Sequence, residues 1–146
     1  MNELARIAYI YDALELEEFL RSMDGSVTEL PITEHLVAGL YSREVRIPAD
    51  TVLVGEIHRT AHINILAKGS ITVFTEDGEK YLEAPATVPA PALTKRVGLT
   101  HSDVVWISVH QTDLTNIEDV KASLVIDADE LLALEPHELE KIICLS

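Results

Sequence analysis

The sequence predicts a mainly β protein: a single small barrel with an N-terminal helix and a C-terminal helical extension. Three observations support this prediction. Short runs rich in β-branched residues follow one another between residues 40 and 110, separated by turn residues. The segments on either side have helical spacing of their apolar residues. A length of 146 residues fits one domain that buries its own core.

The N-terminal segment, residues 1–34, is predicted to be helical. Apolar side chains recur in residues 3–22 at roughly helical intervals: Leu4, Ile7, Ala8, Tyr11, Leu14 and Phe19. The turn-forming run Asp24-Gly25-Ser26 is expected to end this helix.

The central segment, residues 35–112, is predicted to form the barrel. Its predicted strands cover residues 40–47, 51–58, 62–67, 70–75 and 104–110. Glu76-Asp77-Gly78-Glu79 predicts a hairpin turn. Residues 85–94 contain three prolines, which cannot donate to a strand ladder, so they predict an edge strand or a loop-like connection. Short strands with tight turns favour a barrel or sandwich, and the mouth of a barrel can hold a pocket.

The C-terminal segment, residues 113–146, is again predicted to be helical and is rich in acidic residues. Thr115 or Asn116 is expected to cap a first helix, and Asp127 a second. Pro136 stands near the start of a third, where proline is tolerated.

The composition excludes several classes of protein. With 25 acidic and 11 basic residues, the net charge of −14 repels nucleic acid. That charge serves either solubility or an acidic surface for a basic partner. No apolar run approaches the roughly 20 residues of a membrane span, and the first residues do not resemble a signal peptide. The single cysteine, Cys144, excludes an internal disulfide. We therefore expect a cytoplasmic protein with no nucleic-acid or membrane partner.

Polar side chains gather at one end of the predicted barrel. Because side chains alternate across a strand, two sets are expected to face inward: Val52, Val54, Glu56 and His58 in one strand, and His62, Asn64 and Leu66 in the next. Val52, Val54 and Leu66 would then form a packed floor, and the four polar residues a polar mouth.

The remaining histidines and the single tryptophan have weaker signals. Val104, Trp106, Ser108 and His110 share one face of the last strand. Trp106 is expected either in the core or in the wall of a pocket. His35, before the first predicted strand, is expected in a loop or on the surface, His101 in a turn, and His137 at a solvent-facing helix start. No serine or cysteine has a recognisable nucleophile motif.

Residues 50–69 resemble the first motif of the cupins. That motif has a glycine, five residues, His-x-His, three or four residues, Glu, six residues and Gly. This chain has Glu56-x-His58, three residues, His62, six residues and Gly69. Asp50 stands at the first glycine, Glu56 at the first histidine and His62 at the glutamate.

Residues 91–100 are similar to the second cupin motif, Pro-x-Gly-x-x-His, three residues, Asn. Pro91 matches, Leu93 stands at the glycine, Arg96 at the ligand histidine and Thr100 at the asparagine. The resemblance covers about residues 40–111. The runs 35–73 and 93–113 look like a narrower group, the small cupin-like proteins encoded by tailed phages and prophages, which have no settled activity.

The resemblance implies a jelly-roll barrel in which the last strand lies beside the strand of His62, so that His110 can approach it. Two or three imidazoles with one carboxylate suit Fe(II), Mn(II), Ni(II) or Zn(II). We therefore predict a metal site formed by His58, His62, His110 and Glu56.

Arg96 indicates a second kind of chemistry. A guanidinium repels a cation and attracts a carboxylate or phosphate. We predict that Arg96 contacts an anionic ligand, with Asn64 and Trp106 beside it. The alternative is that Arg96 pairs with Glu56.

Three functions remain open at this point. The chain is a module that binds a small molecule or metal, a metal-dependent oxygenase or isomerase acting on a small anion, or a phage interaction protein with a vestigial pocket. The resemblance also implies a homodimer. The apolar face Val105, Ile107 and Val109 needs cover, either from a second copy or from the N-terminal helix.

Overall fold

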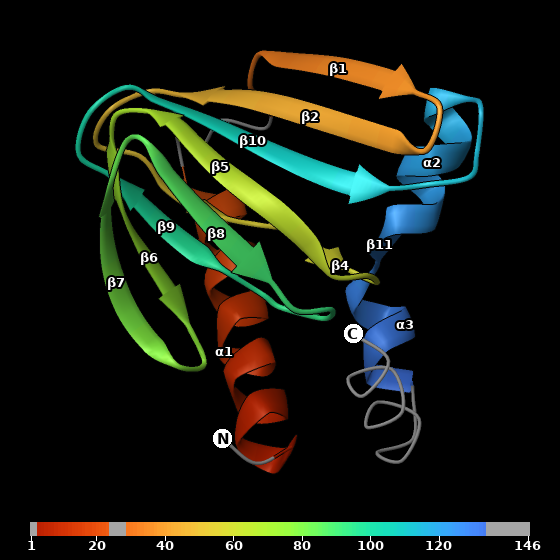
Figure 1. Cartoon of the computed structure of the whole chain (residues 1–146). Coiled ribbons are helices and arrows are strands. Elements are labelled where there is room, and N and C mark those ends of the chain that lie inside the picture. Colours follow the sequence, from red (N-terminus) through yellow and green to blue (C-terminus); the bar gives the residue numbers. More distant parts are fainter. Residues whose placement is uncertain (1–2, 24–28, 134–146) are drawn as a thin grey trace.

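Two antiparallel sheets face each other in a jelly roll, with one long helix beside them (Figure 1). The computed structural model describes residues 3–23 and 29–133. The helices are α1 (Glu3–Ser22), α2 (Ile117–Leu124) and α3 (Ala128–Ala133).

The larger sheet has the strand order β1-β2-β10-β5-β8. Its strands are β1 (Ile32–Val37), β2 (Leu40–Ile47), β10 (Val104–Gln111), β5 (His62–Lys68) and β8 (Ala86–Ala90). All neighbouring pairs are antiparallel. Strand β8 therefore lies at an edge of the sheet. Its Pro89 has no N–H to donate, which an edge strand tolerates because it has only one neighbour.

The smaller sheet has the order β3-β9-β6-β7. Its strands are β3 (Val52–Val54), β9 (Val97–Thr100), β6 (Ser70–Thr75) and β7 (Gly78–Glu83). A separate two-stranded ladder joins β4 (Ile57–His58) to β11 (Val125–Ile126). The C-terminal part of the chain thus forms backbone pairing with the strand of His58.

The inner face of the larger sheet changes from polar to apolar along the strands. Register places Arg43 and Asn64 on either side of Ser108, and Val45 and Leu66 on either side of Trp106. Beyond Ser108 toward the end of β10 lies His110, opposite Tyr41. The strand alternation therefore separates a polar end from an apolar end of one barrel.

The apolar end is the main core. Its buried residues come from both sheets: Ile47, Leu66, Ile71, Val73, Leu82 and Val104. Leu53 and Trp106 pack against them. Closing the two inner faces removes these side chains from water, which stabilises the fold by roughly 25 cal/mol per Å² of apolar surface.

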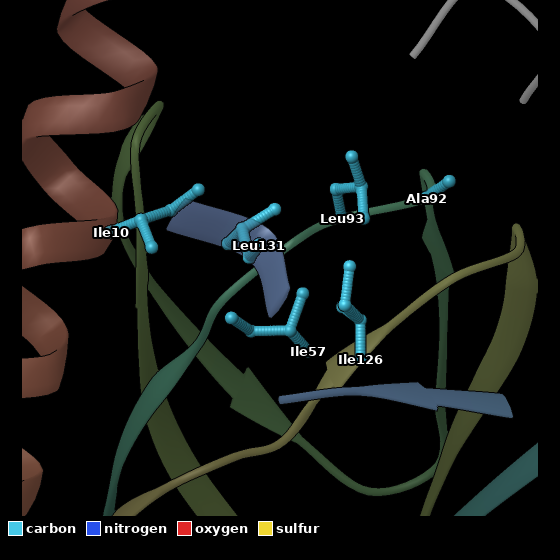
Figure 2. Packing of buried hydrophobic residues seen from close by; sticks show 6 residues of the cluster. All are labelled: Ile10, Ile57, Ala92, Leu93, Ile126 and Leu131. Carbon is cyan, nitrogen blue, oxygen red and sulfur yellow. The ribbon is translucent and has the colours of Figure 1, made fainter. Parts of the chain in front are cut away.

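A second apolar cluster lies outside the barrel and joins the two ends of the chain (Figure 2). It contains Ile10 of α1, Leu131 of α3, Ile126 of β11, Ile57 of β4, and Ala92 and Leu93. Figure 2 shows Leu131 and Ile57 between Ile10 of α1 and the side chains of Ile126 and Leu93. The helices therefore hold the two stretches that resemble the cupin motifs.

Helix α1 is also fixed by polar contacts. The Lys95 ammonium is 3% exposed and lies 2.9 Å from a carboxylate oxygen of Glu17. The Tyr9 hydroxyl donates a hydrogen bond of 2.8 Å to the carbonyl of Phe74. Burial raises the pKa of Tyr9 to about 12, so this hydroxyl keeps its proton.

The structure confirms the predicted fold class and several local predictions. The hairpin turn at Glu76 and Asp77 joins β6 to β7. Asn116 caps α2 by accepting the backbone N–H groups of Glu118 and Asp119, and the Asp127 carboxylate accepts the N–H of Glu130.

Other expectations were wrong in detail. The predicted strand 51–58 is interrupted at Gly55 and Glu56, which changes the phase of the alternation. Val52 is 46% exposed, and Leu53 packs against the core in its place. His35 lies within β1, a strand that was not predicted, because the first predicted strand covered residues 40–47. Strands β9 and β11 were not predicted either. Asp24-Gly25-Ser26, Pro136, His137 and Cys144 lie outside the described residues.

Candidate functional site

Three histidines meet at the polar end of the barrel. His58 comes from β4, His62 from the start of β5 and His110 from the end of β10. Their ring centroids are 4.6 Å apart for His58 and His62, 4.9 Å for His58 and His110, and 4.3 Å for His62 and His110. We call these three residues the histidine cluster.

Burial keeps the histidine cluster neutral. His62 is 8% exposed and His110 2%. Burial, followed by the charges of the other two rings, lowers the pKa of His58 to about 3. Burial lowers the pKa of His110 to about 4, and also lowers that of His62. At neutral pH all three rings therefore present an unprotonated nitrogen.

The hydrogen bonds of the cluster leave ring nitrogens available. His62 Nδ1 lies 3.1 Å from the carbonyl oxygen of Thr60, so Nδ1 holds the proton and Nε2 has the free lone pair. His110 Nδ1 is buried and has no hydrogen-bond partner within the described residues. A buried polar atom without a partner is costly unless something else binds it.

The donor set fits a divalent transition metal in its chemistry. Neutral imidazoles are the ligands that Fe(II), Mn(II), Ni(II) and Zn(II) accept in proteins. As the side chains lie, however, no three His, Cys, Asp or Glu residues of the described chain are arranged to hold a metal ion. Binding by the histidine cluster therefore requires the rings to turn from their present orientations.

Glu56 does not lie where the motif comparison placed it. Its side chain is 56% exposed, and its carboxylate lies 3.9 Å from the guanidinium of Arg43. Because the chain leaves the strand at Gly55 and Glu56, strand alternation no longer fixes the direction of this side chain. The expected pairing of Glu56 with Arg96 is therefore wrong, since Arg43 is the arginine beside it.

Arg96 lines a hollow of about 330 Å³, whose wall includes none of the three histidines. The hollow lies among β6, β7, β8 and the segment before β9, and it is lined by Val73, Leu82, Val88, Pro91, Thr94 and Lys80 with the acids of the 76–79 turn. Arg96 donates to the carbonyl of Pro89 at 3.3 Å, and its buried Nε has no partner within the described residues. Its charge helps to lower the pKa of His58 and His62.

The other two predicted ligand contacts, Asn64 and Trp106, lie at different levels of the barrel. Asn64 is 2% exposed and lies one inward position from His62, where its Oδ1 accepts a 2.9 Å hydrogen bond from Ser108. Trp106 packs against the apolar core at the next inward row. The wall of the hollow does not include Trp106.

Sequence reasoning missed two charged residues near the site. Arg43 lies on the same face of β2 as the buried Tyr41 and Ile47, so the pattern of that strand could have placed it inward. The buried contact of Lys95 with Glu17 of α1 had no local signal in the sequence.

Backbone dihedrals support the alignment with the two motifs. Asp50 has φ of 55°, Leu93 of 60° and Gly69 of 88°. These three positions correspond to glycines of the cupin motifs, and a positive φ is the conformation that favours glycine. The backbone shape is thus retained where two of the glycines are absent.

Solved structures resemble this arrangement of strands. A cupin superfamily protein from Desulfitobacterium hafniense superposes with a TM-score of 0.50 at 7% identity, over 64% of this chain and 87% of that one. A protein from Salmonella typhimurium described as an ethanolamine utilization protein gives 0.51 at 12% identity, over 63% and 77%. The fold is the cupin jelly roll.

A larger protein matches more of the chain. Salicylate 1,2-dioxygenase from Pseudaminobacter salicylatoxidans superposes with a TM-score of 0.55 at 10% identity, over 82% of this chain and 35% of that enzyme. No protein-family model matches the chain, and neither does the sequence of any curated protein. None of the helices among the described residues has the length and apolar character to cross a membrane.

Proposed function

We propose that the histidine cluster is the functional centre of this cupin-fold protein and that it binds one divalent transition metal ion. The observation that supports this most directly is the convergence of three neutral imidazoles, two buried and one partly buried, whose ring centroids lie within 4.9 Å of one another. The partnerless Nδ1 of His110 supports it further, because a metal ion would satisfy that buried atom.

The metal would be held by the rings of His58, His62 and His110. Zinc, iron, manganese and nickel all accept such a set when further positions remain open to a ligand. Glu56 joins the set only if its carboxylate leaves Arg43 and turns inward.

A small anionic molecule is the second part of the proposed function. Three neutral ligands leave the full charge of a divalent ion uncompensated, so an anion is favoured at the open positions. Arg96 and the 330 Å³ hollow that it lines provide a place for it. The apolar residues Val73, Leu82 and Val88 would contact its body, and Arg96 its charged group. Binding rather than turnover is what we propose.

Metal binding is tested on tag-free protein by equilibrium dialysis and elemental analysis at neutral pH. We expect one Zn²⁺, Ni²⁺, Mn²⁺ or Fe²⁺ per chain, and a loss of affinity of at least about tenfold in His62→Gln and His110→Gln. His35→Gln, which changes an exposed histidine of β1, is the control and should keep full affinity. Absence of uptake of all four metals would refute the proposal.

We also propose a homodimer formed by the outer face of the larger sheet. Helix α1 packs beside β3 of the other sheet and does not cover this face (Figure 1). Ile63 on the outer face is 46% exposed, and Val105, Ile107 and Val109 are only partly buried. Light scattering of wild type and Ile63→Asp would test it: the variant should shift to half the mass of the wild type, and a monomeric wild type would contradict it.

The resemblance to small cupin-like proteins of tailed phages and prophages leads us to propose the same origin for this chain. Genes for phage structural or replication proteins beside its own gene would support this origin, and a setting among chromosomal metabolic genes would contradict it.

A further inference from the structure

Arg43 is a charged residue on the inner face of the barrel, beside the histidine cluster. It follows Tyr41 by two positions on β2, and Tyr41 is 2% exposed. Register places Arg43 opposite Ser108, the inward neighbour of His110 on β10. The positive charge of Arg43 helps to lower the pKa of both His58 and His110. Its guanidinium therefore borders the cluster.

The guanidinium of Arg43 makes only one long contact with the described residues. Its ion pair with Glu56 spans 3.9 Å, which is beyond hydrogen-bond distance. None of the described residues accepts a hydrogen bond from it, although a guanidinium has five donors. Glu56 is 56% exposed and Arg43 33%, so the pair is weak and screened by water.

The arrangement differs from that of the other arginine on the same strand. Arg46 points to the outer face, is 62% exposed and lies 3.6 Å from Glu44. Both ion pairs are longer than a hydrogen bond, but of these two arginines only Arg43 lies on the face of the histidine cluster. Arg43 has access to the site, and a partner that it can release at little cost.

We propose that Arg43 is an anion-binding residue of the histidine site and that Glu56 is its displaceable counter-ion. The ligand class is a small molecule bearing a carboxylate or phosphate, whose anionic group lies between Arg43 and the cluster. Arg43 and Arg96 then act from two sides, so the site selects anions over neutral molecules. This inference rests on the proposed function only in taking the cluster as the binding centre, because Arg43 needs no metal to bind an anion.

The proposal predicts opposite effects for the two members of the pair. Removing Arg43 removes a charge-assisted contact with the ligand, which corresponds to a loss of affinity of roughly 10- to 100-fold. Removing the charge of Glu56 leaves Arg43 without a competitor, so anion affinity should rise. A merely structural pair would give losses of the same sign in both variants.

The experiment is a calorimetric titration with inorganic phosphate and, separately, with acetate, using metal-free protein and protein loaded with Co²⁺. Arg43→Gln, Arg43→Lys and Glu56→Gln are compared with the matched controls Arg46→Gln and Glu44→Gln. We expect Arg43→Gln to lose at least about tenfold in phosphate affinity, Arg43→Lys to retain part of it, and Glu56→Gln to gain severalfold. The two controls should match wild type.

Co²⁺ affinity is measured on the same samples without added phosphate. Arg43→Gln should bind Co²⁺ at least as tightly as wild type, because a nearby positive charge is removed. If wild type binds Co²⁺ but Arg43→Gln keeps its phosphate affinity, the inference about Arg43 is wrong and the proposed function stands. If no variant binds Co²⁺ while the phosphate pattern appears, the metal proposal is wrong and Arg43 is still the anion contact. Wild type that binds neither phosphate nor acetate overturns the inference, as does equal loss of phosphate and Co²⁺ affinity in Arg43→Gln.

Discussion

The backbone N–H of Leu93 donates a hydrogen bond of 2.7 Å to the carbonyl oxygen of His58. A second bond runs from the N–H of Gly55 to the carbonyl of Arg96, at 2.9 Å. These two bonds tie together the two stretches that resemble cupin motifs. The backbone that supports His58 therefore depends on the conformation of Leu93, which is 2% exposed and has φ of 60°.

Leu93 combines a buried side chain with a backbone conformation that favours glycine. Leu93→Ala should destabilise the protein by about 2–5 kcal/mol through the lost apolar contacts. Leu93→Gly should be no less stable than Leu93→Ala, because glycine relieves a strain of about 1 kcal/mol that alanine keeps. Urea unfolding measures both. The neighbouring Ala92 has no positive φ, so Ala92→Gly is the control and should be destabilising. An unfolding free energy clearly lower for Leu93→Gly than for Leu93→Ala would contradict this account.

Gly69 and Gly39 offer a matched comparison of strain and steric clash. Their φ values are 88° and 87°, so alanine suffers the same backbone strain of about 1 kcal/mol at each. A Cβ at Gly69 would meet the carbonyl oxygen of Asp103 at 2.2 Å, whereas a Cβ at Gly39 would meet nothing within 4 Å. Gly69→Ala should therefore lower the melting temperature far more than Gly39→Ala. Similar melting temperatures for the two variants would show that the chain at Asp103 can move aside.

The histidine cluster should make stability depend on pH between about 6.5 and 4. The folded-state pKa of His58 is about 3 and that of His110 about 4, both below the unfolded value of 6.5. The unfolded chain therefore binds more protons, and the contribution to stability is complete above pH 6.5 and lost as pH falls. Each histidine contributes up to about 1.4 kcal/mol per pH unit in that range.

Urea unfolding of metal-free protein at pH 7, 6 and 5 measures this slope. His110→Gln should flatten it, and His35→Gln, at an exposed position, should leave it unchanged. Stability that stays constant or increases from pH 7 to pH 5 would show that the rings are already protonated or solvated in the folded protein.

The ion pair between Glu17 and Lys95 should respond asymmetrically to substitution. Lys95 is 3% exposed and Glu17 22%, so Glu17→Gln leaves a buried ammonium without its carboxylate and should cost about 3–5 kcal/mol. Lys95→Met removes the buried charge itself and should cost much less. Glu17 also pairs with Arg21, whose side chain is 75% exposed, and Arg21→Gln should change the unfolding free energy by less than about 0.5 kcal/mol. Equal costs for Glu17→Gln and Lys95→Met would mean that Lys95 can reach water.

The features that could be predicted from sequence are those set by local chemistry. Asn116 and Asp127 could be predicted to start helices because their side chains cap them directly. The alternation of His62, Asn64 and Leu66 was predicted correctly because β5 has a paired strand on each side. The phase around Val52 could not be predicted, because the break at Gly55 and Glu56 is imposed by contacts with the segment of Arg96.

The partners of the charged residues were harder to predict than their positions. Arg43 forms an ion pair with Glu56, which lies between two strands of the chain, and Lys95 forms one with Glu17, 78 residues earlier in helix α1. Such pairs depend on how distant elements pack, which no local pattern encodes. The convergence of His110 with His58 and His62 could be expected only through the resemblance to the cupins, since it requires the last strand to lie beside β5.

The ladder between β4 and β11 has a consequence for protein synthesis. His58 pairs with Val125, so a nascent chain has made all three histidines before it makes the strand that holds the first of them. At ribosomal rates of about 5–20 residues per second, the 15 residues from position 110 to position 125 take roughly 1 to 3 s. During that interval the barrel strands can assemble while the imidazoles are still open to the cell. Any ion or small molecule in the finished pocket can therefore enter before the C-terminal segment docks.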